Sequence, residues 1–302
     1  QGIFAEHSYK HADDLIVQTG LRLDYHNLYG FLFTPRIHAR YSLSAHTIFR
    51  VSAGKGYRTP NVLAENNHFL ANSRNIIIAP DLRQEEAWNY GLNMTKYFSL
   101  GARQLTANVE AYRTSFVNQI VVDLDSSVDE VSFYNLDGES FSNNYQLELA
   151  YEIVKGLDAR TAIRYSDVQY TINDNLVDKP LMSKYKGLIT LSYATPLKKW
   201  QFDLTSQFNG PGRIPSTQSN PAEYQMPETF DPYTIIHAQI TKFFRTWNVY
   251  VGAENLTDFT QDGPVLAADQ PFGEHFDGSL IWGPLHGRKF YLGARFGISR
   301  DQ

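Results

Sequence analysis

The sequence predicts an all-β protein whose antiparallel strands form a transmembrane β-barrel, and three observations predict this fold. Apolar and polar residues alternate along about thirteen segments, as they do in strands with one apolar face. Many segments are about 10 to 14 residues long, enough for a tilted strand to cross a bilayer, whereas strands of soluble proteins are usually shorter. Tight and long connections alternate along the chain. Alternation alone also fits a soluble sandwich, so the strand lengths and the order of the connections decide in favour of a membrane barrel.

The alternation is clearest in six segments, at 15–26, 102–112, 143–154, 157–166, 199–208 and 286–299. In the last of them, HGRKFYLGARFGIS, the apolar parity consists of Phe290, Leu292, Ala294, Phe296 and Ile298. The other parity holds lysine, tyrosine, arginine and glycine. In a membrane barrel the apolar parity faces lipid and the polar parity faces a wet lumen.

The connections differ in length in a regular order. Tight links are expected at 11–14, 42–46, 98–103, 154–158, 195–199 and 243–246. Long links are expected at 55–85, 123–140, 172–184, 209–231 and 257–286, with only the 27–34 link short. Because alternate links of an antiparallel meander lie at the same end, nearly all the long loops gather on one side. Outer-membrane barrels have this asymmetry, with short periplasmic turns and long extracellular loops.

Aromatic residues also gather near the expected strand ends, for example at 25–31, 97–98, 193–200 and 243–247. Aromatic girdles at the two membrane interfaces have this distribution.

Composition excludes several function classes. A formal net charge of -5 without a basic run argues against a nucleic-acid partner. The absence of cysteine excludes a disulfide framework and a thiolate metal site. No H-E-x-x-H, G-x-S-x-G, P-loop or G-x-G-x-x-G element occurs in its required context, so we expect neither an enzyme nor a bound cofactor.

The expected strand count points to an incomplete barrel. Bacterial barrels close with an even number of strands, and an open sheet edge cannot persist in hydrocarbon because its backbone groups lack partners. About thirteen strands is an odd number. The chain also opens without a secretory signal, because GIFAEHSYK carries charges where an apolar region is required. We therefore expect residues 1–302 to form the C-terminal portion of one larger barrel domain.

Two paired elements suggest a family. FRVSAGKGYRTPN at 49–61 and APDLRQEEAWNYG at 79–91 resemble the paired boxes of TonB-dependent outer-membrane receptors. Three further stretches are similar to elements of that family: 21–42, 249–259 with its G-x-x-N-L pattern, and the closing strand at 281–296. The residues that carry the resemblance are Arg58, Pro60, Asp81, Leu82, Asn255 and Leu256. The chain departs from the family at GISRDQ, which follows Phe296 where such receptors often end on an aromatic residue.

The resemblance implies a barrel of about 22 strands in the bacterial outer membrane, filled by an N-terminal plug. Neither the plug nor the short box that contacts the TonB complex is recognised in these residues. The implied function is energised uptake of a scarce, bulky nutrient, such as an iron-siderophore complex, haem or cobalamin. The implied partners are outer-membrane lipid, the TonB complex and this small ligand.

The long loops hold the candidate ligand-binding residues, because irregular segments on a rigid scaffold usually do the binding. His68 lies between the two boxes, where haem receptors of the family carry a ligand histidine. Aromatic and polar residues in the last loop suit a bulky organometallic ligand, and would equally suit loops that pack on one another. His275, His286 and Asp277 could bind a metal, but their spacing matches no defined site, and the metal is left open. The ligand candidates are His68, Phe69, Phe272, His275 and Phe276.

Charged residues on the polar parity are interpreted as the wall of a wet lumen rather than as general acids or bases. These are Arg40, Arg50, Arg164 and Glu148. Two other functions stay open, namely a passive or glycan-taking outer-membrane channel and a soluble all-β binding module.

Overall fold

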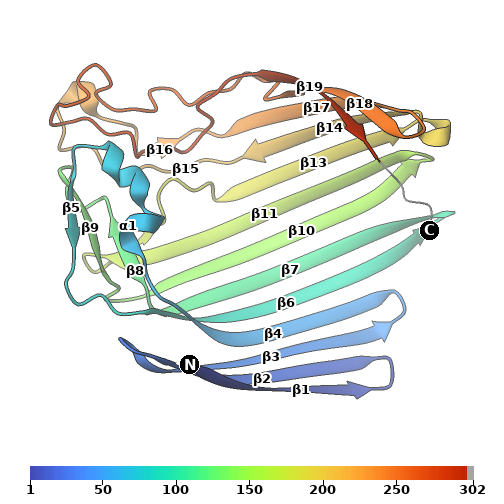
Figure 1. Ribbon diagram of the computed structural model, residues 1–302, viewed down its shortest axis with the longest axis horizontal. Coiled ribbons are helices and arrows are strands. Elements are labelled where there is room, and N and C mark those ends of the chain that lie inside the picture. Colours follow the sequence, from blue (N-terminus) through green and yellow to red (C-terminus); the bar gives the residue numbers. More distant parts are fainter. Residues whose placement is uncertain (298–302) are drawn as a thin grey trace.

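The computed structural model describes residues 1–297, and they form one long antiparallel meander (Figure 1). Thirteen strands follow one another in a 14-stranded sheet, and β12 (Asn175–Asp178) pairs with β11 beside that path. The expected all-β meander is confirmed. Its strands are β1 (Gly2–His11), β2 (Leu15–His26), β3 (Gly30–Ser44), β4 (Thr47–Arg58), β6 (Glu85–Leu100), β7 (Arg103–Asn118), β10 (Ser140–Val154), β11 (Leu157–Ile172), β13 (Tyr185–Ala194), β14 (Trp200–Asn209), β17 (Tyr233–Phe243), β18 (Trp247–Glu254) and β19 (Lys289–Phe296).

The register places the two parities on opposite faces of the whole sheet. Residues that pair directly across strands point to the same side, and successive residues point to opposite sides. One polar row crosses eight strands: Arg40, Arg50, Asn93, Glu110, Gln146, Arg164, Lys186 and Asn209. The neighbouring row, on the opposite face, is apolar: Tyr41, Phe49, Met94, Val109, Leu147, Ile163, Gly187 and Phe208.

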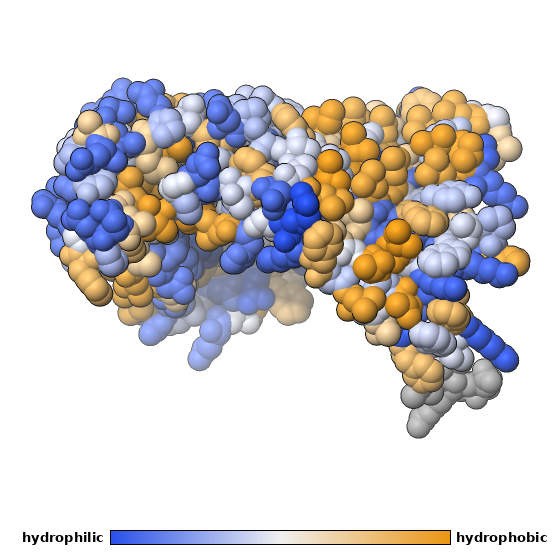
Figure 2. Space-filling view, turned by 90° about the horizontal axis from the view of Figure 1, so that it is seen from above, coloured by the Kyte–Doolittle hydropathy of each residue, from blue (hydrophilic) through white to orange (hydrophobic). Residues whose placement is uncertain are grey.

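The apolar face is exposed rather than packed on a second layer. On β19, Leu292 is 76% exposed, and Phe290 and Phe296 are exposed to a similar degree. Figure 2 shows apolar side chains on the surface of the strand region, whereas the opposite end of the molecule is largely hydrophilic. Ile298, the last residue expected on this parity, lies outside the described residues. An exposed apolar face of this extent is what a lipid-facing wall requires.

The connections sort by length to the two ends of the strands, as expected. The tight turns lie at one end, on the right in Figure 1, and the long loops lie at the other. Within residues 1–297, β1 and β19 each pair on one side only, so the sheet has two unpaired edges. No helix in that range is both long and apolar enough to span a membrane.

The long loops form a compact body, called here the loop cap, which comprises residues 59–84, 119–139, 173–184, 210–232 and 255–288. It contains the short helix α1 (Val62–Glu65), the 3-10 turns η1 (Asn67–Ala71) and η3 (Ala222–Tyr224), and two small sheets. In one sheet β5 (Asn75–Ile78) runs parallel to β9 (Glu130–Asn135), which pairs with β8 (Ile120–Asp123). The other joins β15 (Gly212–Arg213) to β16 (Thr229–Phe230). The long links expected from the sequence therefore contain short regular elements of their own.

The cap has its own hydrophobic core. Val131 and Phe133 of β9 are almost fully buried, and Phe69, Ile120 and Leu124 pack with them. The NIII run of β5 and the IVVD run of β8 each pair with β9, which lies between them, because each run alone is too short to bury its side chains. Burial of apolar surface therefore organises this end of the molecule.

Candidate functional site

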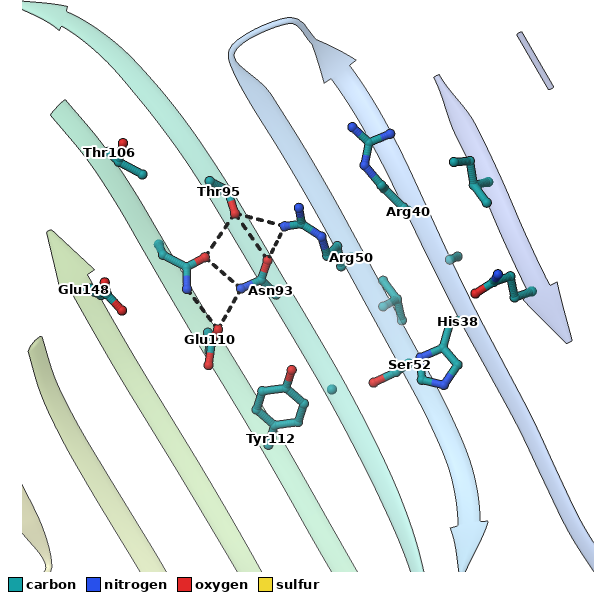
Figure 3. A pocket seen from close by; sticks show the side chains of 16 residues that line it. His38, Arg40, Arg50, Ser52, Asn93, Thr95, Thr106, Glu110, Tyr112 and Glu148 are labelled. Carbon is teal, nitrogen blue, oxygen red and sulfur yellow. Dashed lines mark hydrogen bonds between the residues drawn. The ribbon is translucent and has the colours of Figure 1, made fainter. Parts of the chain in front are cut away.

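The polar face of the sheet holds a hollow of about 550 Å³, called here the wall groove, that spans β2 to β10 (Figure 3). Three of the four predicted lumen-wall residues, Arg40, Arg50 and Glu148, line it. Arg164 lies in the same row as Arg50, but outside the groove.

A hydrogen-bonded network occupies the centre of the wall groove (Figure 3). The Arg50 guanidinium donates to Asn93 Oδ1 at 2.9 Å and to Thr95 Oγ1 at 3.0 Å. The Asn93 amide donates in turn to Glu110 Oε1 at 3.0 Å, and the Asn108 amide donates to the same oxygen at 2.9 Å. Arg50 and Glu110 thus hold opposite ends of one network, joined through neutral amides. Fixed dipoles of this kind stabilise both charges and hold the side chains in place.

Arg40 differs from Arg50, which it faces directly across β3 and β4. Two like charges in directly opposed positions repel each other. Arg50 is engaged by the network, whereas Arg40 makes no ion pair or side-chain hydrogen bond within residues 1–297. The groove therefore presents a positive group beside the carboxylates of Glu110 and Glu148. Glu148 is itself 3.3 Å from the Arg160 guanidinium.

A buried ion pair fastens three loops of the cap together. Arg74 and Asp277 are 3% and 4% exposed, and Arg74 Nε lies 2.8 Å from Asp277 Oδ2. The same guanidinium donates to the carbonyls of Leu124, Ser127 and Glu130 at 3.0 to 3.3 Å. Arg74 thereby joins residues 59–84, 119–139 and 255–288. A buried charge of this kind is tolerated only because it is fully paired.

The residues that carry the family resemblance close the bases of two loops. Arg58, the last residue of β4, forms ion pairs with Glu85, the first residue of β6, and with Glu65 of α1. Pro60 is the second residue after β4, Asp81 is exposed, and Leu82 packs against the cap core. These contacts join the start of the 59–84 loop to its end.

Asn255 closes the last loop in a similar way. It has a positive φ of 52°, a conformation in which asparagine is favoured among residues with a side chain. Its amide donates to the carbonyls of Phe259 and His286 at 2.8 and 3.1 Å. The Leu256 N–H donates to the carbonyl of Ile236 at 2.7 Å, and the Leu256 carbonyl accepts from Arg288. The N-L pair therefore fixes both ends of the loop on β17.

The structure brings the two segments that hold the predicted ligand residues side by side, since the Ser73 N–H donates to the Phe276 carbonyl at 2.8 Å and the Gly278 N–H to the Ala71 carbonyl at 3.1 Å. The predicted residues themselves differ in exposure. Phe272 is fully exposed, and His68 is exposed on η1. Phe69 is 4% exposed and packs edge-on against Phe133, so it belongs to the cap core. His275 and Phe276 are half-buried, and the His275 ring lies 5.3 Å from that of Tyr224. Although its side chain is exposed, desolvation by the surrounding cap residues lowers the pKa of His68, while the Asp277 carboxylate opposes that shift.

Acidic and histidine residues do not gather into a metal site. Within the described range no three histidine or carboxylate side chains form a metal-binding group. Asp277, which we considered as a metal ligand, is occupied by Arg74, and it also accepts from the Ser279 N–H and hydroxyl.

The cap is strongly acidic. Its five loops contain 18 acidic residues and 6 basic ones, a formal charge of -12, although the whole chain carries only -5. The rest of the chain is therefore net positive. The basic residues of the cap are Arg74, Arg83, Lys179, Lys184, Arg213 and Arg288.

Several residues of the site could not be identified from the sequence. Arg74 lies in a loop without a recognisable pattern, and its partner is 203 positions away. Asn93, Thr95 and Asn108 of the wall groove are uncharged and therefore unremarkable, although their alternation with apolar neighbours placed them on the polar parity.

Comparison with known proteins gives a family and a fold. The model of the family described as TonB dependent receptor-like, β-barrel matches residues 1–256. No curated protein matches the chain.

Solved structures with the same fold are distant in sequence. A mutant of the ferric enterobactin receptor of Pseudomonas aeruginosa superimposes with a TM-score of 0.69 at 16% identity, over 97% of this chain and 44% of that one. The FrpB iron transporter of Neisseria meningitidis gives 0.65 at 16%, over 97% and 44%. The copper transporter OprC gives 0.68 at 14%, over 98% and 47%. The chain spans less than half the length of these structures.

Proposed function

The chain belongs to the TonB-dependent receptor β-barrel family, and from this we propose that it forms the C-terminal part of an outer-membrane importer. The importer takes up a scarce, bulky metal complex and is energised through TonB. Members of the family are receptors and transporters rather than enzymes. The proposal rests on where the residues of the family motifs lie. Arg58 and Asn255 join the loop cap to a sheet that has one apolar face.

Further strands of the same protein flank the edges at β1 and β19. Both edges leave backbone N–H and carbonyl groups unpaired in the described range, and hydrocarbon supplies no partner for them. The share of the solved structures that this chain covers, 44% to 47%, leaves room for these strands and for a plug. The plug rests against the polar face, where an acidic side chain would pair with Arg40.

The ligand is bound first by the loop cap. Its -12 charge repels a complex with several negative charges and favours a neutral or cationic one. Among the three ligand classes considered, cobalamin and the less anionic siderophore complexes fit this charge better than a polyanionic catecholate. Phe272 is the exposed aromatic residue that would cover such a ligand.

The first test uses the intact protein that contains this chain. A closed barrel migrates faster on a detergent gel before boiling than after it. Uptake of cobalamin, haem and iron-siderophore complexes is then measured in cells with and without TonB. We expect uptake of one ligand that disappears without TonB. Uptake that persists without TonB identifies a passive channel, and a soluble protein without the gel shift identifies a soluble binding module.

A matched pair of variants tests the role of the cap. Phe272→Ala removes an exposed aromatic side chain from the cap, and Leu28→Ala removes an exposed apolar side chain from the link between β2 and β3. We expect Phe272→Ala to weaken binding of the transported ligand by about tenfold and Leu28→Ala to leave it unchanged. Equal effects of the two substitutions contradict a ligand site that includes Phe272.

A further inference from the structure

Two neighbouring turns at the tight-turn end carry a cluster of positive charge. The turn at 195–199, which contains η2 (Pro196–Lys198), lies beside the turn at 244–246, as Figure 1 shows at its upper right. The Phe243 N–H donates to the Lys199 carbonyl at 2.9 Å, which joins the two turns. No acidic residue occurs in 194–202 or 241–249. The cluster, called here the basic turn cluster, consists of Lys198, Lys199, Lys242 and Arg245.

Lys242 lies on the apolar face of the sheet. It pairs directly with Trp200, whose strand continues on that face with Phe202. Lys242 Nζ lies 4.8 Å from the Trp200 ring centroid and 5.3 Å from that of Phe244. Phe244 stacks in turn on Trp247, with centroids 4.2 Å apart. An ammonium group on this face would be costly in hydrocarbon, so it must lie at the level of the headgroups.

The four basic side chains form no ion pair within residues 1–297. The aromatic rings below Lys242 stabilise its charge only from the apolar side. At a membrane interface, phosphate groups would be available to the other sides of these ammonium and guanidinium groups. Exposed aromatic and aliphatic side chains next to the cluster, Phe202 and Ile240 among them, provide a surface for acyl chains.

We propose that the basic turn cluster binds an anionic phospholipid of the periplasmic leaflet, with its phosphate at Lys242 and its acyl chains along β14 and β17. Leu197 is 87% exposed at the tip of the adjoining turn, where it would contact the same lipid. The inference rests on the proposed placement of the chain in a membrane, in which short turns face the periplasm. It is independent of the transported ligand, because the loop cap lies at the other end of the strands.

A second site on the sheet provides a matched control. Lys96 of β6 lies on the apolar face and 5.2 Å from the Phe98 ring centroid, so it repeats the geometry of Lys242. At the adjacent turn Arg103 is 3.3 Å from Glu152, which neutralises the local charge. Lys96 therefore shows what a single lysine above an aromatic ring contributes when no cluster of basic residues surrounds it.

The experiment uses the intact protein reconstituted into phosphatidylcholine vesicles that contain either brominated phosphatidylglycerol or brominated phosphatidylcholine. Bromine quenches tryptophan emission at short range, and Trp200 and Trp247 lie in the cluster. A variant with both tryptophans replaced by phenylalanine gives the background from other tryptophans. The gel shift on boiling is recorded for every sample.

We expect brominated phosphatidylglycerol to quench Trp200 and Trp247 more than brominated phosphatidylcholine does. Each basic group near an anionic surface strengthens lipid binding by about fivefold. The triple variant Lys198→Gln, Lys199→Gln and Lys242→Gln should lower the preference on the order of a hundredfold, and Lys96→Gln should leave it unchanged.

Two results overturn the inference, and they are distinguishable. Equal quenching by the two lipids in a protein that shows the gel shift overturns the lipid site and leaves the barrel proposal standing. Absence of the gel shift in the unmodified protein overturns both.

Discussion

The loop cap and the 14-stranded sheet, called here the strand wall, place their apolar side chains in opposite environments. In the cap, Val131 and Phe133 are almost fully buried, and even a guanidinium, that of Arg74, is 3% exposed. In the wall, apolar side chains such as Leu292 and Ile163 are exposed, and charged side chains such as Arg164 lie on the other face. The cap resembles the interior of a soluble domain, whereas the wall has no buried core of its own.

This contrast indicates which solvent suits each region. The cap excludes water from its own core, so its stability depends on complementary partners within the chain. The wall turns its apolar residues outward, so its stability depends on lipid and on a complete set of backbone hydrogen bonds. Destabilising substitutions in the cap should therefore be detected by proteolysis of its loops, and those in the wall by unfolding of the barrel in vesicles.

The largest expected effect is the loss of the Arg74 guanidinium. Arg74→Met leaves the Asp277 carboxylate buried without its partner, which should destabilise the cap by about 3 to 5 kcal/mol. Limited proteolysis of the intact protein in vesicles should show faster cleavage within 59–84 and 255–288, with the gel shift retained.

The double variant Arg74→Met, Asp277→Leu serves as the control, because replacing both partners of a buried pair by apolar residues costs less than removing one. If Arg74→Met abolishes the gel shift and leaves cleavage unchanged, cap and wall are not independent regions.

The second effect concerns the orientation of the wall. Ile163→Arg places a charge on the apolar face near the middle of β11, and should destabilise the barrel by about 2 to 4 kcal/mol in vesicles. Ala162→Arg, one residue away, faces the polar side opposite Glu148 and should be tolerated. Urea unfolding in vesicles measures both variants, and the reverse order of stability would mean that the faces have been assigned the wrong way round.

A third, smaller effect is the response of the cap to pH. Burial alone would raise the pKa of Asp123, but hydrogen bonds from Ser126, from the Asp125 N–H and from Tyr134 lower it overall. A carboxyl with a depressed folded-state pKa contributes stability above its unfolded pKa and loses it as the pH falls through its folded pKa. Cap resistance to an acid-stable protease should therefore fall below about pH 4.

Asp123→Asn should remove this pH dependence and cost about 1.5 to 3 kcal/mol at neutral pH, because charge-assisted bonds become neutral ones. A profile below pH 4 that is unchanged in the variant would assign the acid sensitivity of the cap to another carboxyl.

The smallest effect is expected on the exposed polar wall. Arg164→Gln removes an exposed side chain that makes no ion pair within residues 1–297, and should change the free energy of unfolding by less than about 0.5 kcal/mol. Urea unfolding in vesicles measures this change. A loss above about 1 kcal/mol would show that Arg164 has a partner elsewhere in the intact barrel.

The wall could be predicted from sequence because its pattern is local. Alternation over eight to sixteen residues fixes which residues share a face, because a shift of one residue would turn every side chain to the opposite face. The expected turns and loops follow from the same pattern. The predicted lumen-wall residues Arg40, Arg50 and Glu148 could be placed on a face in this way, although their contacts could not.

The cap could not be predicted in the same way because its contacts are non-local. The parallel pairing of β5 with β9 joins residues more than fifty positions apart, and nothing in either short run specifies the other. Phe69 and Phe272 are equally aromatic in sequence, yet one is buried in the core and the other is fully exposed. Only the fold distinguishes a packing residue from a surface residue in such loops.

The Arg74–Asp277 pair also sets an order of events during biogenesis. Arg74 lies in the loop between β4 and β6, and its counter-ion arrives 203 residues later, on the loop between β18 and β19. Until that loop has crossed the membrane, burial of the guanidinium would leave a charge without a partner, so the first cap loop must wait in an open state. Closure of the cap therefore follows formation of the β18–β19 hairpin, which couples assembly of the cap to assembly of this part of the sheet.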